Sequence, residues 1–218
     1  MEITWLGHNA VRIKSGQSVL VMDPYTDASG LKLPPQLAQA NVVTVSGADP
    51  DFSAVANITG DKPPTVINGP GEYEASSFRI KGIRTPAYAE GGEIAWNTVY
   101  AVELEGMILS HLGNPGRLLT NREIEELGSP HVLLLAIGSK NGLSGEDTVE
   151  MVNAIGPKIV IPVLYAHAGN KADLRELAPF LKELGATPEA PQNRTTITRA
   201  TLPEETTVTV LAPASVLI

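Results

Sequence analysis

Residues 42–55 read VVTVSGADPDFSAV, and this stretch predicts a buried strand, a tight loop and the first turn of a helix. The strand is apolar and β-branched, as a strand buried on both faces should be, with Val42, Val43 and Val45. Asp49 followed by Pro50 is typical of an N-cap and a first helical position. Such a loop is a common place for chemistry, and it carries the carboxylates of Asp49 and Asp51.

The composition indicates a globular chain of 218 residues that can form one domain over 1–218, with 43% hydrophobic residues and a mean hydropathy near zero. No apolar run is long enough for a membrane span, and the first residues lack the form of a signal peptide, so we expect a cytoplasmic protein. The absence of cysteine excludes disulfides and thiolate metal sites. A net charge of −8 argues against nucleic acid or an anionic membrane as the main partner.

The order of predicted elements is mostly strands, then alternating strands and helices, then strands again. In the first part we expect strands within 2–14 and over 18–23, 65–67 and 78–85, a turn at 69–73, a glycine-rich loop at 88–96 and a hairpin over 97–110. In the second part we expect helices after Thr120, after Ser144 and over 171–184, strands at 132–137 and 158–162, and a final strand pair at 195–201 and 206–211. This order fits an α/β (α+β) fold, an αββα sandwich of two mixed β-sheets flanked by helices.

Several stretches, taken together, resemble the metallo-β-lactamase superfamily, in particular its small stand-alone branch of hydrolases similar to zinc-dependent ones. In chain order they read ITWLGH from Ile3, VMDPY from Val21, GPGEYE from Gly69, NTVY from Asn97, HLGN from His111 and KIVIP from Lys158. The resemblance extends from Ile3 to about Tyr165. It implies a metal cleft at one edge of the sandwich, between the two sheets.

The active members of that superfamily bind one or two metals, usually zinc, and hydrolyse their substrates with a metal-bound water. A catalytic zinc needs at least three protein ligands, with histidine nitrogen or cysteine sulfur preferred and carboxylates in support. The metal lowers the pKa of its water to about 7, which makes hydroxide available at neutral pH. The superfamily supplies its first ligands from a His-x-His-x-Asp-His motif.

Laid on this chain, the motif covers residues 47–52, and only Asp51 matches it. The three histidines of the motif are replaced by Gly47, Asp49 and Phe52. Glycine and phenylalanine cannot coordinate a metal. The motif therefore predicts a site that has lost most of its metal ligands.

The remaining ligand positions agree with that prediction. A further histidine is expected near residues 88–90, which read YAE from Tyr88, and the bridging aspartate falls on Asn114. The histidine that ends the same stretch falls on Arg117, and the histidine after Ile-Pro falls on Leu164. His111 matches the superfamily, but the resemblance assigns it no ligand role.

The four histidines also have structural interpretations. His8 follows a strand, where a hydrogen-bonded structural histidine is expected, and His111 is expected to form hydrogen bonds at the core edge. His131 follows Ser129-Pro130 and is expected in a solvated turn. His167 is expected in an ordinary loop, although it could swing towards the cleft.

The two carboxylates of the motif have structural interpretations as well. Asp49 is expected to cap the helix, and Asp51 is expected to hold the loop by accepting backbone amide hydrogen bonds. We also expect Asp51 and Asn114 to lie at the same edge of the sandwich. There Phe52 and Leu164 should pack together or onto neighbouring loops and narrow the cleft, each contributing on the order of 1.5–3 kcal/mol.

Three functional hypotheses remain open. The first is a pseudoenzyme without metal or cofactor, which acts by binding an unknown small molecule or protein partner. The second is an active hydrolase with an altered site, in which Asp49, Asp51 and a rearranged His8, His111 or His167 hold a harder ion such as Mg²⁺ or Mn²⁺. The third is metal-free acid/base catalysis by Asp51 and His111. The first fits the replacements best, because several of them are unable to coordinate.

Overall fold

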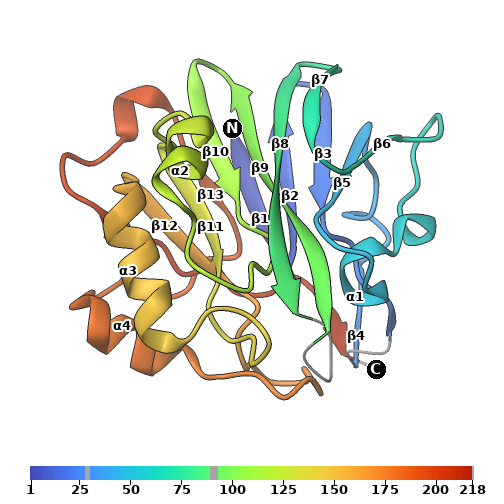
Figure 1. Ribbon diagram of the computed structural model, residues 1–218. Helices are drawn as coiled ribbons and strands as arrows, with labels where there is room; N and C mark the ends of the chain where they lie inside the picture. Colours follow the sequence, from blue (N-terminus) through green and yellow to red (C-terminus); the bar gives the residue numbers. More distant parts are fainter. Residues whose placement is uncertain (28–29, 89–92, 218) are drawn as a thin grey trace.

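The computed structural model describes residues 1–27, 30–88 and 93–217, and it contains two large β-sheets that face each other (Figure 1). One sheet has six strands in the order β13-β1-β2-β3-β5-β6, and the other has seven in the order β14-β12-β11-β10-β9-β8-β7. A third sheet is small and pairs only β15 with β4. Both large sheets contain parallel and antiparallel pairs, so they are mixed, as predicted.

The strands of the six-stranded sheet come mainly from the first third of the chain. They are β1 (Glu2–Gly7), β2 (Ala10–Ser15), β3 (Ser18–Met22), β5 (Val42–Val45), β6 (Thr65–Asn68) and β13 (Thr195–Thr196). All four residues of β5 are buried, which confirms the strand predicted from the valines. The small sheet pairs β4 (Leu31–Lys32) with β15 (Val216–Leu217).

The seven-stranded sheet combines a long meander with parallel strands. Its members are β7 (Gly71–Ala75), β8 (Phe78–Tyr88), β9 (Ile94–Leu104), β10 (Met107–His111), β11 (Val132–Ala136), β12 (Ile159–Val163) and β14 (Thr207–Val208). β10, β11 and β12 run parallel, so the loops that follow them leave at one edge of the sheet.

Three helices cover the outer face of the seven-stranded sheet, and the short α1 (Pro50–Ser53) lies beside the six-stranded one (Figure 1). α2 (Asn121–Leu127) and α3 (Gly145–Ile155) begin with capping boxes at Thr120 and Ser144, and α4 (Leu177–Leu184) follows them. All three end at a glycine with positive φ, which closes a helix without Cβ strain. No helix among the described residues is long and apolar enough to cross a membrane.

The main hydrophobic core lies between the sheets and under the helices, and Trp5, Phe78 and Tyr100 are its largest fully buried side chains. A second cluster packs on the other face of the six-stranded sheet, where loop residues such as Leu33 and Ile58 replace the helical layer expected there. η2 (Val55–Asn57) adds one short turn on this side, and η3 (Arg199–Thr201) lies near the far end of the chain.

Four local predictions were wrong. Residues 71–73 of the turn expected at 69–73 belong to β7, because Gly71 takes φ 145° and lets the chain enter a strand directly. The expected loop at 88–96 is shorter, since β8 runs to Tyr88 and β9 begins at Ile94; residues 89–92 lie outside the described residues. The last strands do not pair with each other, since β13 joins one large sheet and β14 the other. The helix expected over 171–184 begins only at Leu177.

Candidate functional site

The loops after β1, β3, β5, β10 and β12 meet at one edge of the sandwich, where the carboxyl ends of parallel strands usually place binding groups. Leu164 donates its backbone amide to the carbonyl of His8 at 2.9 Å, and Thr98 donates to the carbonyl of Ser46 at 2.7 Å. The first bond joins loops from opposite sheets, and the second joins the loop after β5 to strand β9 of the other sheet. The two sheets are therefore connected at this edge.

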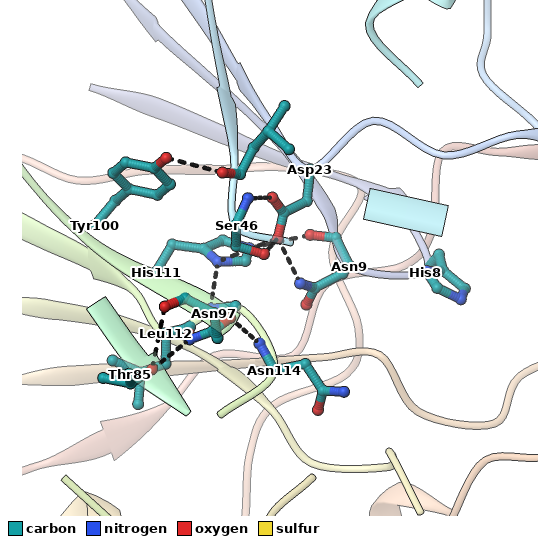
Figure 2. Close-up of polar contacts among 12 residues, drawn as sticks. His8, Asn9, Asp23, Ser46, Thr85, Asn97, Tyr100, His111, Leu112 and Asn114 are labelled. Atoms are coloured by element: carbon teal, nitrogen blue, oxygen red, sulfur yellow. Dashed lines mark hydrogen bonds and ion pairs between the residues drawn. The ribbon is translucent and has the colours of Figure 1, made fainter. Parts of the chain in front are cut away.

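A buried polar network centred on Asp23 lies beneath this edge (Figure 2). The Asp23 carboxylate accepts the backbone amide of Ser46 at 2.7 Å, its hydroxyl at 2.6 Å, and the side-chain amide of Asn9 at 2.7 Å. Burial raises the pKa of Asp23, while His111 nearby and these hydrogen bonds oppose the rise. Asp23 also has φ 48°, an unusual backbone conformation outside glycine, of the kind that clusters at functional sites.

His111 connects this network to the seven-stranded sheet, and its hydrogen bonds define its tautomer. Its Nδ1 accepts the amide of Gly113 at 2.9 Å, so that nitrogen carries no proton, and Nε2 donates to the carbonyl of Asn9 at 3.0 Å. The 3.8 Å separation between Nδ1 and Asp23 is therefore a contact without a shared proton. His111 has the hydrogen-bonding role expected at the core edge, and it is fully buried.

Asn97 organises the neighbouring loop from the seven-stranded side. Its side-chain nitrogen donates to the carbonyl of Leu112 at 2.8 Å and to the hydroxyl of Thr85 at 2.9 Å, and its oxygen accepts the amide of Asn114 at 2.9 Å (Figure 2). A side chain at Gly113 would meet that oxygen at 2.2 Å. Asn97 thus holds residues 112–114 in one conformation against the 46–52 loop.

The 46–52 loop carries the two carboxylates singled out from the sequence. Asp49 caps α1 as predicted, accepting the amide of Asp51 at 2.9 Å. Asp51 accepts the hydroxyl of Thr26 at 3.3 Å, and no backbone amide donates to it in the described part of the chain, so its expected role in holding backbone amides was wrong. Its other oxygen lies 4.0 Å from Nε2 of His8.

His8 is buried beside this loop with one nitrogen unused. Its Nδ1 is inaccessible and has no hydrogen-bond partner among the described residues. Burial lowers the pKa of His8, and the charges of Asp51 and Asp49 oppose that shift. The ring of Phe52 lies against it, with centroids 5.5 Å apart, and the ring of Tyr25 lies 5.9 Å away. His8 is therefore a neutral, enclosed side chain rather than an exposed acid or base.

The family model described as the beta-lactamase superfamily domain matches residues 2–164, which is most of the chain. The chain belongs to this superfamily. A Methanoregula boonei protein named UPF0173 metal-dependent hydrolase is 25% identical over 197 residues, covering 76% of this chain and 82% of its own. A protein of the same name from Methanopyrus kandleri is 25% identical and covers 85% of this chain and 93% of its own.

Solved structures agree with the fold. A Thermotoga maritima protein of the metallo-β-lactamase superfamily superposes with a TM-score of 0.77 at 28% identity, covering 96% of this chain and 97% of its own. Igni18, a metallo hydrolase from Ignicoccus hospitalis, superposes with a TM-score of 0.68 at 18% identity, covering 100% of this chain and 97% of its own. At this identity the similarity supports the fold alone. The two mixed sheets with few helices are those of the metallo-β-lactamase superfamily.

Three residues that the resemblance places at ligand positions, Gly47, Phe52 and Leu164, lie in the segments after β5 and β12. Leu164 is 2% exposed and has φ 52°, and Phe52 packs on His8. Gly47 leaves space, because a Cβ there would meet its nearest neighbours, Phe52 and the carbonyl of Trp96, only at 3.9 Å. The loops keep a defined backbone, whereas the side chains at these three positions are apolar or absent.

The other residues expected at the superfamily's cleft have local partners. The carboxamide oxygen of Asn114 lies against Gly142, where a Cβ would approach it to 2.2 Å. Arg117 forms a bidentate pair with Glu123, at 2.8 and 2.9 Å. Tyr88 packs on Gly116, and His167 lies edge-on to Trp5, with its Nδ1 3.1 Å from the carbonyl of Ala168.

Two predicted groupings are not formed. No contact joins Asp51 to His111 within the ranges that the structure describes, since Asp51 faces His8 and His111 faces Asn9 and Asp23. His131 is half-buried and its Nδ1 accepts the amide of Ile108 at 3.1 Å, so its assignment to a solvated turn was wrong. Among the residues that the structure describes, no three His, Asp or Glu side chains come together as metal ligands.

Sequence reasoning missed the network of Asn9, Asp23, Ser46 and Asn97. The signal was present, because Asp23 and Ser46 each follow a buried apolar strand directly and Asn9 is in the turn after β1. Polar residues at the carboxyl ends of adjacent parallel strands, such as β3 and β5, must lie close together. Which of them would hydrogen-bond depends on how the second sheet packs.

Proposed function

We propose that this chain is a hydrolase-fold protein that has lost the zinc site of its superfamily and acts by binding a ligand or partner. The observation that carries the proposal is the apolar character of two ligand positions: the ring of half-buried Phe52 lies 5.5 Å, centre to centre, from that of His8, and Leu164 is 2% exposed. Apolar side chains where ligands would converge disfavour a charged ion there.

The chemistry of the polar groups nearby supports this proposal. A catalytic zinc needs three or more nitrogen, sulfur or oxygen ligands. Asp49 uses one carboxylate oxygen to cap α1, and the facing pair of His8 and Asp51 supplies two groups only. The residues present therefore do not fit a catalytic zinc, and we assign no step to one.

A second candidate is the altered-site hydrolase, which the names of the relatives favour as metal-dependent hydrolases. One local observation also favours it: His8 is close to the charges of both Asp51 and Asp49, with His167 nearby. In that case Asp49 and Asp51 would hold a harder ion such as Mg²⁺ or Mn²⁺, for which carboxylate oxygen is the preferred ligand.

Metal analysis of protein purified without chelator separates the two candidates. We expect well under one equivalent of zinc, magnesium or manganese per chain, a melting temperature unchanged by EDTA, and background hydrolysis of β-lactam, phosphodiester and lactone substrates. A tightly bound metal would stabilise the folded state by RT ln(1 + [L]/Kd), about 2.7 kcal/mol at a hundred times Kd. A stoichiometric metal that disappears in Asp51→Asn would instead establish the altered-site hydrolase.

A further inference from the structure

The hairpin of β8 and β9 carries most of the exposed apolar surface that the described residues contain. Ile94 is 75% exposed, Trp96 58% and Tyr88 44%. Among the described residues, the only other large apolar side chain with similar exposure is Val66. In the ladder Tyr88 is opposite Ile94, and Pro86 is opposite Trp96. Directly opposed residues share a face of a sheet, so these side chains form one patch.

The patch faces the mouth of the candidate site. Tyr100 lies on the same face of β9 as Trp96, because side chains alternate along a strand, and its hydroxyl donates to the carbonyl of Val45 in the other sheet at 2.8 Å. The carbonyl of Trp96 lies next to Gly47. A ligand on the patch would therefore border the loop in which the zinc motif has been replaced.

Arg84 gives the patch a charge. Its guanidinium lies 5.2 Å from the centre of the Trp96 ring, which orients it by a cation–π contact. No carboxylate pairs with Arg84 among the described residues, whereas Arg79 on the same strand pairs with Glu103 at 3.8 Å. In a chain of net charge −8, a cation held against an exposed ring, with no acidic partner among the described residues, complements an anion.

The area of the patch distinguishes a small ligand from a second copy of the chain as its occupant. The exposed parts of Tyr88, Ile94 and Trp96 amount to roughly 300–400 Å², given the area that such side chains can bury. A stable interface between two copies buries about 800 Å² on each. The patch is too small for a lasting dimer but has the size of a functional apolar patch on a monomer.

We propose that Arg84, Tyr88, Ile94 and Trp96 bind a ligand in which a flat apolar ring system carries an anionic group, such as a carboxylate or sulfonate. The rings and Ile94 cover the apolar body, and Arg84 donates hydrogen bonds to the anion. This assignment rests on the proposed binding function and specifies its ligand class. Its test does not involve zinc, so failure of one proposal is distinguishable from failure of the other.

Two fluorescent probes of similar ring structure test the proposal on the full chain. 1-Anilinonaphthalene-8-sulfonate carries a charge, and N-phenyl-1-naphthylamine does not. We expect the sulfonate to bind once per chain, about tenfold more weakly in Arg84→Gln, and unchanged in the control Arg79→Gln. The neutral probe should bind more weakly to the wild type and be insensitive to Arg84→Gln. Trp96→Ala should abolish the binding of both probes, and Trp96→Phe, which retains a ring, should restore part of it.

The tryptophans supply an independent readout, because Trp5 is fully buried and Trp96 is exposed. At a sulfonate concentration near the dissociation constant of the wild type, bound sulfonate should protect Trp96 from acrylamide quenching clearly in the wild type and only slightly in Arg84→Gln. Equal effects of Arg84→Gln and Arg79→Gln, or equal affinity for both probes, would overturn the proposal. So would a light-scattering mass of two chains that falls to one in Trp96→Ala, because a second copy would then cover the patch.

Discussion

The network around Asp23 and the rim formed by Gly47, Phe52 and Leu164 are neighbours at one edge of the sandwich. They differ in their side chains, which are polar and hydrogen-bonded in the network and apolar or absent on the rim. In the network, the Asp23 carboxylate accepts hydrogen bonds from Asn9 and Ser46, whereas the imidazole of His111, from the other sheet, is satisfied by the backbone groups of Asn9 and Gly113. Unusual backbone occurs in both regions, with φ 52° at Leu164 on the rim and 48° at Asp23 in the network, but the three rim residues carry no polar side chain. From this difference we expect the network to contribute more than the rim to the arrangement of the loops.

Asp23→Ala tests the network most directly and should have the largest effect. The change leaves the Ser46 amide and the Asn9 side chain buried without their acceptor, so we expect a loss of about 3–5 kcal/mol in the free energy of unfolding. Urea denaturation measures it. Asp61→Ala, at an exposed carboxylate, should change stability by less than about 0.5 kcal/mol. Similar small effects at both positions would contradict the role given to the network.

Introducing the superfamily's metal ligands at the rim tests the other region of the comparison. We expect a variant with histidine at positions 47, 49, 52 and 164 and aspartate at 114 to gain zinc binding, because a Cβ fits at Gly47 and the loops are already held. Saturating zinc should raise its stability by about 3 kcal/mol, detected as a zinc-dependent melting temperature. The parent chain, with Asp51 alone from the motif, is the matched control. A folded variant indifferent to zinc would show that the loops no longer present ligands correctly.

The pH dependence of stability should report on His8. Its pKa in the folded state is lowered, so between that value and the unfolded value of about 6.5 the unfolded chain binds more protons. The stability contribution of this residue is therefore complete above about pH 6.5 and declines as the pH falls below it. Asparagine tolerates the positive φ of this position, so His8→Asn should keep the backbone and remove that decline. An identical pH profile in the variant would assign the decline to other groups.

The smallest expected effect lies outside the compared regions, at the pair of Arg117 and Glu123. The hydrogen bond from Arg117 lowers the pKa of Glu123 to about 2. Its stability contribution is present above the unfolded pKa of about 4.3 and is lost as the pH falls through about 2. Because Arg117 is 39% exposed, solvent screening limits the effect of Glu123→Gln to about 1 kcal/mol at pH 7. Thermal melting at pH 7 and pH 2 should show the difference only at pH 7.

The sequence predicted elements whose patterns are local. The valines of β5, the capping boxes of α2 and α3 and the glycines that end the helices act within a few residues, so their positions were predictable. The partners of β13 and β14 were not, because two-residue strands carry no periodic pattern and depend on which sheet edge is free. For the same reason the Asp23 network and the pairing of His8 with Asp51 required three-dimensional packing, although Asp51 itself was singled out.

The C-terminal part of the chain has a consequence for the order in which the protein folds. β13 pairs with β1 at one sheet edge, and β14 pairs with β12 at an edge of the other. During synthesis, the strand that completes the edge beside β1 emerges only after every other strand of the six-stranded sheet has been made. Until then β1 presents open backbone groups, which other chains could pair with. A chain stalled before residue 195 should therefore aggregate or recruit chaperones although most of its core residues have already been translated.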